Sequence, residues 1–284
     1  MWLPNRGATY VRDFPGPEGA PLLLLLHGWT MTADLNWSPS FQTLSQQFRV
    51  VALDHRGHGR GIRSTDAFTL EDCADDAAAL LRRLGVGRAI IVGYSMGGPI
   101  AQLLWRRHPD LVAALVLCAT SDHFSERPWE VALFSLAPLG IVLSRFLPVH
   151  VAIAAVRRRR RRMSMSGPML DLAMEAVTRH DWRAVLEAAS ALGRFDSRSW
   201  VSRIDVPTAI VHTTNDHVVS SQRQLRLGAA IQGASIHHVD GDHDACVSRP
   251  DSFVPALIDA CAAVATRVRH APSAPPPGTP VLAA

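Results

Sequence analysis

Short apolar runs alternate with amphipathic segments along most of the 284 residues, and this alternation restricts the fold more than any other feature. The first four runs are apolar almost throughout, as expected of strands that are covered on both faces of a parallel sheet. The runs predicted as strands are Leu22–Leu26, Val50–Leu53, Ala89–Val92, Ala114–Leu117, Ala209–Val211 and Ser235–Val239. Their alternation with helical segments predicts an α/β fold with a mostly parallel, doubly wound sheet.

Helical patterns lie between and after these runs. Thr69-Leu70-Glu71-Asp72 resembles a capping box and predicts a helix to about Leu84, closed by Gly85. The other predicted helices are Met96–Arg107, Gln222–Ile231 and Pro250–Arg269. Ala8–Phe14 is predicted as an antiparallel edge strand that precedes the first parallel one.

The alternation is interrupted between Ser121 and Ser199, where the sequence is mostly helical in pattern and has no clear strand. We therefore predict a core made of residues 1–120 and 200–270, with a helical lid inserted at residues 121–199. Residues 271–284 are rich in Pro, Ala and Gly and are predicted to be a disordered tail.

The positive charge of the chain is concentrated in one place. All 29 basic residues are Arg, and six of them form the run Arg157–Arg162. Without that run the formal net charge of +4 becomes −2. A surface that binds nucleic acid is therefore not expected.

The spacing of the cysteines indicates whether they can bind a metal ion together. The four cysteines lie far apart along the sequence, so neither a metal site nor a disulfide framework is expected, and all four are predicted to be reduced thiols. They are Cys73, Cys118, Cys246 and Cys261.

The N-terminal segment Met1–Pro21 contains four charged residues and no apolar run. No cleavable signal is therefore predicted, and a cytoplasmic protein is expected.

The segment Gly93-Tyr94-Ser95-Met96-Gly97-Gly98 stands immediately after a predicted strand and immediately before a predicted helix. In this context a G-x-S-x-G motif indicates a sharp turn that raises the Ser95 hydroxyl above the sheet edge. Glycine leaves room for the chain to close up at positions 93 and 97. The turn also directs the Met96 N–H toward a developing negative charge. The alternative is a glycine-rich turn that binds a phosphate or nothing.

With this motif the chain resembles the α/β-hydrolase family along nearly its whole length. His27-Gly28-Trp29 matches the family's oxyanion loop, so the resemblance implies the Trp29 N–H as a second donor beside that of Met96. The segment from Asp54 to Gly59 is similar to a loop common in the family and is interpreted as scaffold. Only one or two strands fit before Leu22, so the antiparallel edge is expected to be shortened.

A serine hydroxyl is a weak nucleophile until a base accepts its proton and an acid orients that base. The family order of serine, acid and histidine implies Asp216 as the acid and His243 as the base. Each follows a predicted strand, so one crevice at the carboxyl ends of the strands can collect them with Ser95. Other candidates remain open: Asp122 for the acid, and His217, His237 or His238 for the base.

The resemblance implies acyl transfer through an acyl-enzyme on Ser95 that water then hydrolyses. The aspartate-nucleophile chemistry of haloalkane dehalogenases and epoxide hydrolases is disfavoured, because position 95 is serine. The sequence contains no P-loop and no G-x-G-x-x-G after a strand, so no cofactor is expected. The expected reaction is hydrolysis of carboxylic esters, or related acyl bonds, of apolar small molecules.

Two alternatives to this reaction stay open. The same acyl-enzyme can support acyltransferase or perhydrolase chemistry, as in the cofactor-free haloperoxidase relatives. The same fold also occurs in ligand-binding proteins with little turnover. The sequence does not separate these alternatives, and it leaves the oligomeric state open.

Val131–Val156 is the most apolar stretch, and the arginine run follows it directly. Arg145 and Pro148 divide it into pieces that are shorter than the ~20 residues a membrane span needs. Lid helices over an apolar pocket are expected. The alternative is peripheral contact with the inner membrane surface through Val131–Arg162, because arginine beside apolar surface attracts anionic lipid. Both interpretations predict a hydrophobic acyl or alcohol group in the substrate.

Overall fold

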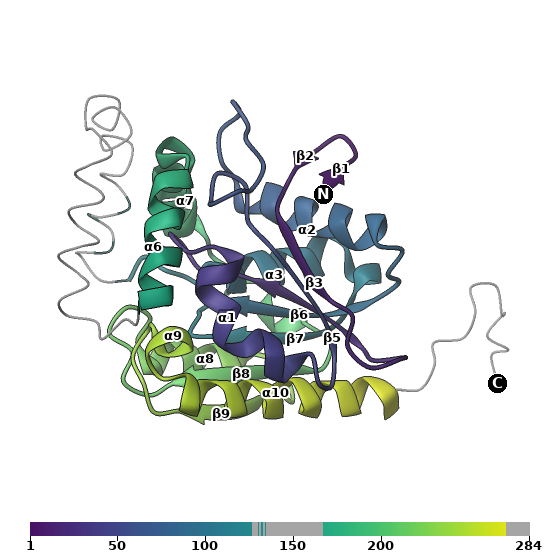
Figure 1. Ribbon diagram of the computed structural model, residues 1–284. Coiled ribbons are helices and arrows are strands. Elements are labelled where there is room, and N and C mark those ends of the chain that lie inside the picture. Colours follow the sequence, from purple (N-terminus) through teal and green to yellow (C-terminus); the bar gives the residue numbers. More distant parts are fainter. Residues whose placement is uncertain (127–129, 131, 133, 135–166, 271–284) are drawn as a thin grey trace, which may run out of the picture.

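The structure is a computed structural model in which residues 1–126, 130, 132, 134 and 167–270 are described. Its centre is a sheet of seven strands in the order β3-β5-β4-β6-β7-β8-β9, parallel except for β3 (Figure 1). The strands are β3 (Val11–Phe14), β4 (Leu22–Leu26), β5 (Arg49–Leu53), β6 (Ala89–Tyr94), β7 (Val112–Cys118), β8 (Thr208–Thr213) and β9 (Ser235–Val239). The predicted α/β fold with a mostly parallel sheet is confirmed.

The five leucines of β4 show why the central strands are apolar throughout. Leu22, Leu24 and Leu26 pack in one hydrophobic cluster and Leu23 and Leu25 in another, because side chains alternate between the two faces of a strand. All five are buried. The sheet is therefore covered on both faces, as the sequence predicts.

Helices cover each face of the sheet (Figure 1). Side chains of α2 (Leu70–Arg83), α3 (Gly97–Arg107) and α8 (Ser221–Ala230) belong to the cluster on one face. Those of α1 (Ala33–Leu44), α9 (Ala245–Ser248) and α10 (Pro250–His270) belong to the cluster on the other. At the start of α2, Thr69 Oγ1 accepts from the Asp72 N–H at 3.0 Å, as predicted.

The antiparallel edge is short, as expected. β3 pairs with β5 over four residues, and no further strand follows β3 in this sheet among the described residues. The predicted edge strand at Ala8–Phe14 begins later, at Val11. Ala8 instead belongs to a separate two-stranded sheet of β1 (Trp2–Leu3) and β2 (Gly7–Ala8).

Helix α1 is not predicted from the sequence. Ala33, Trp37, Phe41 and Leu44 form an apolar stripe against the sheet, but Pro39 lies inside the helix and obscures the pattern. Thr32 caps the helix, with Oγ1 accepting from the Leu35 N–H at 3.1 Å. The helix is stabilised by the packing of this stripe on the sheet.

The described part of the predicted lid contains α6 (Gly167–Arg179) and α7 (Trp182–Arg194) (Figure 1). The predicted boundaries of the lid stay a prediction, and the predicted tail at 271–284 lies outside the described residues. Apart from Ala132 and Phe134, so does Val131–Arg162. No helix of the described ranges is long and apolar enough to span a membrane. All four cysteines are buried free thiols.

Candidate active site

Ser95 occupies the sharp turn between β6 and α3 with a φ of +51°. A positive φ is unfavourable for a residue with a Cβ and persists only where surrounding contacts fix it. Here the Ser95 N–H donates to the Cys118 carbonyl at 2.9 Å, and Thr120 Oγ1 donates to the Ser95 carbonyl at 2.8 Å. The turn is thereby attached to the end of β7, and the Ser95 side chain is left partly exposed.

The glycines on both sides of Ser95 are required by space. A Cβ at Gly97 would lie 2.2 Å from the Leu26 carbonyl oxygen, and a Cβ at Gly93 would lie 2.3 Å from the Gly97 carbonyl oxygen. Both distances are to backbone atoms, which cannot move aside easily. The turn therefore has the close approach that the sequence motif indicates.

His243 lies in the loop between β9 and α9, and its ring connects the serine to a carboxylate. Its Nε2 lies 2.9 Å from Ser95 Oγ, and its Nδ1 lies 2.8 Å from Asp216 Oδ2. An ionised carboxylate only accepts, so Nδ1 carries the proton and Nε2 is free to accept from the serine hydroxyl. Tyr94 Oη donates to the His243 carbonyl at 2.6 Å and so attaches this loop to β6.

The carboxylate of Asp216 is fully buried and surrounded by donors. Its Oδ1 accepts from the N–H groups of Val218 and Val219, both at 2.8 Å. Its Oδ2 accepts from Thr213 Oγ1 at 2.8 Å and Gln224 Nε2 at 3.1 Å, in addition to His243. Hydrogen bonds of this kind fix the carboxylate in one orientation.

Gln224 is a site residue that sequence reasoning missed. It lies on α8, is fully buried, and its amide also donates to the Val219 carbonyl at 2.8 Å. Its Oε1 accepts from the Thr213 N–H at 3.0 Å. The only signal in the sequence is an uncharged polar residue at a buried position of an amphipathic helix, which does not identify its partner.

Among the hydrogen bonds of the described residues, those of the other candidates reach neither Ser95 nor the His243 ring. The Asp122 carboxylate contacts its neighbours Ser121 and His123. The His217 side chain is 82% exposed. The remaining two belong to β9, where the ring of His238 contacts His212 and the ring of His237 contacts Ser235.

The predicted oxyanion loop lies against Ser95. A Cβ at Gly28 would meet the Ser95 Cβ at 3.4 Å. The Gly28 N–H donates to Asn36 Oδ1 at 2.9 Å. Among the hydrogen bonds of the described residues, the N–H groups of Trp29 and Met96 have no acceptor, so both can donate to an oxyanion.

Three buried histidines next to this loop are neutral. His27 Nε2 accepts from the His55 N–H at 2.9 Å, so its Nδ1 carries the proton and donates to the Gly28 carbonyl at 2.8 Å. Burial lowers the pKa of His27 to about 3 and lowers the pKa values of His55 and His58 well below their ordinary range. Within the described ranges, both ring nitrogens of His55 and Nε2 of His58 have no hydrogen-bond partner.

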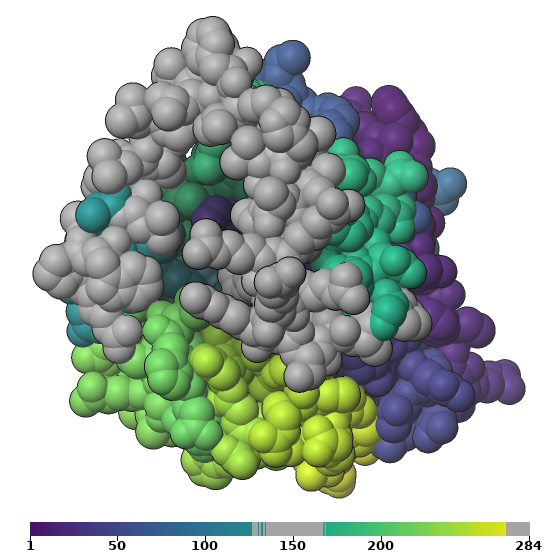
Figure 2. Space-filling view, turned by 60° about the vertical axis from the view of Figure 1, so that its left-hand side comes forward, coloured from purple at the N-terminus to yellow at the C-terminus, as the bar shows by residue number. Residues whose placement is uncertain are grey.

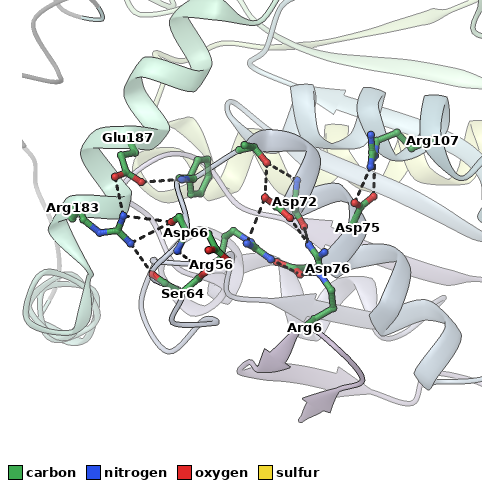
Figure 3. Close-up of polar contacts among 12 residues, drawn as sticks. Arg6, Arg56, Ser64, Asp66, Asp72, Asp75, Asp76, Arg107, Arg183 and Glu187 are labelled. Atoms are coloured by element: carbon green, nitrogen blue, oxygen red, sulfur yellow. Dashed lines mark hydrogen bonds and ion pairs between the residues drawn. The ribbon is translucent and has the colours of Figure 1, made fainter.

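The loop from Asp54 to Gly59 makes mainly structural contacts. The Asp54 carboxylate accepts from the backbone N–H groups of Ala33 and Arg60, each at 2.8 Å. The Arg56 guanidinium forms an ion pair with Asp76 on α2 at 2.8 Å (Figure 3). No group of three or more His, Cys, Asp or Glu side chains in the described part of the chain is arranged to hold a metal ion.

Figure 2 shows the yellow C-terminal helices against the blue and purple N-terminal part of the chain. Side chains of α1, α9 and α10 share one hydrophobic cluster. Segments far apart along the chain therefore pack together next to the loop of His243.

Comparisons with known proteins show the family to which the chain belongs. Residues 21–138 match the family model described as alpha/beta hydrolase fold. A non-heme chloroperoxidase from Streptomyces lividans is 30% identical in an alignment that covers 88% of this chain and 94% of the relative. A bifunctional esterase/perhydrolase from Acinetobacter calcoaceticus is 30% identical over 72% of this chain and 77% of its own. The crystal structure of an enol-lactonase from Burkholderia xenovorans is similar with a TM-score of 0.75 at 24% identity, covering 89% of this chain and 96% of that one.

Proposed function

Because the chain belongs to the alpha/beta hydrolase fold family, we propose that it is a serine hydrolase that cleaves carboxylic esters, or related acyl bonds, of apolar small molecules. The observation that supports this most is the continuous series of contacts from Asp216 through His243 to Ser95 Oγ. Three side chains from distant parts of the sequence have the mutual geometry of an activated nucleophile.

In the proposed mechanism Ser95 Oγ attacks the carbonyl carbon of the ester while His243 Nε2 accepts the hydroxyl proton. Asp216 holds the ring in the required tautomer and stabilises the imidazolium that forms. The N–H groups of Trp29 and Met96 donate to the oxyanion, and each such donor typically lowers the barrier by about 3 kcal/mol.

The tetrahedral intermediate then breaks its bond to the alcohol oxygen, which takes the proton from His243. The product is an acyl ester of Ser95. Water attacks this ester with His243 as base, the bond between the acyl carbon and Ser95 Oγ breaks, and the serine recovers its proton. The acid is released and the enzyme returns to its starting state.

The names of two relatives favour a second candidate function, which is perhydrolysis. Hydrogen peroxide would attack the same acyl-enzyme in place of water, and would release a peroxyacid with Ser95 restored. The two functions differ only in the second nucleophile. Hydrolysis and perhydrolysis are therefore separated by adding peroxide to a reaction with a simple ester and measuring the peroxyacid through its oxidation of bromide.

Para-nitrophenyl esters graded from acetate to octanoate test the proposed function. We expect turnover with a kcat of roughly 1 s⁻¹ or more, and a kcat/KM that rises with acyl length, because the sequence of Val131–Val156 predicts an apolar lid. Release of nitrophenolate measures the rate. Saturable binding of the esters with no rate above the buffer background would instead identify a ligand-binding member of the fold.

The same ester series run with anionic vesicles tests peripheral membrane contact. If Val131–Arg162 binds anionic lipid, part of the enzyme sediments with the vesicles and its kcat/KM changes, whereas neutral vesicles have no effect. An unchanged rate and no sedimentation would contradict this contact.

A further inference from the structure

The turn at residues 28–31 contains one of the two proposed oxyanion donors, and its backbone is strained. The Met31 N–H donates to the Gly28 carbonyl at 3.2 Å and closes the turn around Trp29 and Thr30. Thr30, at the third position, has a φ of +60°. This value is usual for glycine at that position of a type II turn and unfavourable for a β-branched residue. The turn therefore needs contacts that hold Thr30 in place.

Two of the holding contacts come from the segment of α6 and α7, about 150 residues farther along the chain. The Trp29 indole Nε1 donates to the Val185 carbonyl of α7 at 2.8 Å. His180, between α6 and α7, places its Nε2 at 3.2 Å from the Thr30 carbonyl. Within the turn, Thr30 Oγ1 also donates to the Trp29 carbonyl at 2.6 Å.

The hydrogen bonds of His180 fix which of its nitrogens carries the proton. The Gly59 N–H donates to His180 Nδ1 at 2.9 Å, so Nδ1 is the acceptor and bears no hydrogen. The neutral ring therefore has its proton on Nε2 and donates it to the Thr30 carbonyl. The ring is nearly buried, and burial together with the nearby Arg63 lowers its pKa to about 4. His180 is thus a fixed donor at neutral pH.

The α6–α7 segment that contains His180 is hydrogen-bonded to loops of the core. The Asp181 N–H donates to the Gly57 carbonyl at 2.8 Å. The Arg183 guanidinium donates to the Ser64 carbonyl at 2.6 Å, and Glu187 accepts from the Phe68 N–H at 2.8 Å (Figure 3). Each of these bonds joins the α6–α7 segment to a core loop, so His180 is held rigidly with respect to the sheet.

We propose that His180 is a positioning residue for the oxyanion hole, because it holds the strained turn that carries the Trp29 N–H by donating Nε2–H to the Thr30 carbonyl. Without this bond Thr30 is free to leave its positive φ, and the Trp29 N–H moves away from the reacting carbonyl. This inference rests on the proposed serine hydrolase function and deepens it: the segment between β7 and β8 contributes to the chemical step as well as to the shape of the pocket.

Two conservative variants separate the two hydrogen bonds of His180. The amide nitrogen of His180→Gln can replace Nε2 and keep the bond to the Thr30 carbonyl. The shorter amide of His180→Asn can replace Nδ1 and keep the bond from the Gly59 N–H, but it does not reach Thr30. We expect kcat for a para-nitrophenyl ester to fall roughly 10- to 100-fold in His180→Asn with KM nearly unchanged, and to stay within about threefold in His180→Gln.

Arg49→Met is the matched control for the loss of a hydrogen-bonding side chain. It removes the ion pair with Asp13 at the amino end of β5, the end of the strands opposite to Ser95, so kcat should be unchanged. Equal losses of kcat in His180→Gln and His180→Asn, or no loss in either, would overturn the inference. If His180→Asn does not fold, a tenfold loss of kcat in folded His180→Gln would also overturn it. An inactive wild-type enzyme would contradict the proposed function, whereas an active one with unaffected variants contradicts only the role of His180.

Discussion

Replacing Ser95 with alanine is expected to reduce kcat for para-nitrophenyl esters by about 10⁶-fold. The change removes the Oγ that is 2.9 Å from His243 Nε2, so no acyl-enzyme forms. Only the contribution of the oxyanion hole and of substrate binding remains. KM should change little, because the hydroxyl is a small part of the surface that contacts the substrate.

The stronger form of this prediction uses the double variant with His243→Ala. A base acts only through its nucleophile, so the single variants and the double variant should have nearly equal residual rates. Steady-state kinetics of the three variants measure this, with melting temperatures as the control for folding. If the two effects multiply, so that the double variant is far slower than Ser95→Ala, the two residues do not act as a unit and the mechanism is wrong.

Acidification is expected to unfold the protein well above the pH at which its carboxylates are protonated. Four buried histidines, His27, His55, His58 and His180, have pKa values below the ordinary value in the folded protein, mainly because of burial. The charged Arg63 lowers the pKa values of His58 and His180 further, and each ring makes it harder for its neighbours to become protonated. The folded protein thus keeps all four rings neutral at a pH where the unfolded chain protonates them.

The contribution of these rings to the free energy of unfolding is therefore complete above about pH 6.5, and it decreases as the pH falls below that value. Each ring that stays neutral contributes a loss of about 1.4 kcal/mol per pH unit, so the buried rings together lose several kcal/mol by pH 5. Typical domains have only ~5–15 kcal/mol of stability in total. The melting temperature should consequently fall by about 20 °C between pH 7 and pH 5.

Calorimetry over this pH range measures the effect. His180→Gln removes one of the four titrating rings, so its melting temperature should depend on pH about one quarter less steeply than that of the wild type. A melting temperature that stays constant within ~3 °C from pH 7 to pH 5 would show that the histidines are protonated in the folded protein as easily as in the unfolded chain.

The sequence predicts the parts of the fold and site that depend on local patterns. The leucines of β4 are buried on both faces of the sheet, so their apolar run predicts a central strand without information about the neighbouring strands. The turn at Ser95 is encoded by adjacent glycines, and Asp216 and His243 each follow a strand whose end lies at the same edge of the sheet. Position after a strand fits both residues, and the family order of serine, acid and histidine selects them from the other candidates.

The parts that could not be predicted depend on contacts between distant residues. Helix α1 was missed because Pro39 lies inside it and buried polar residues such as Asn36 interrupt its apolar stripe. Gln224 and His180 look like ordinary polar residues of helical segments until the fold places them beside Asp216 and Thr30. Gln224 orients the Asp216 carboxylate and His180 orients the turn at Thr30, each through one hydrogen bond to that group. A single hydrogen bond produces no periodic pattern in the sequence.

Covalent labelling with a fluorophosphonate, followed by intact-mass and peptide-mass measurement, tests the central claim most directly. The claim is that His243 and Asp216 make the Ser95 hydroxyl nucleophilic. We expect one adduct per chain on the peptide that contains Ser95, slower labelling in Asp216→Asn, and none in Ser95→Ala. An adduct that forms in Ser95→Ala at the wild-type rate would contradict the claim.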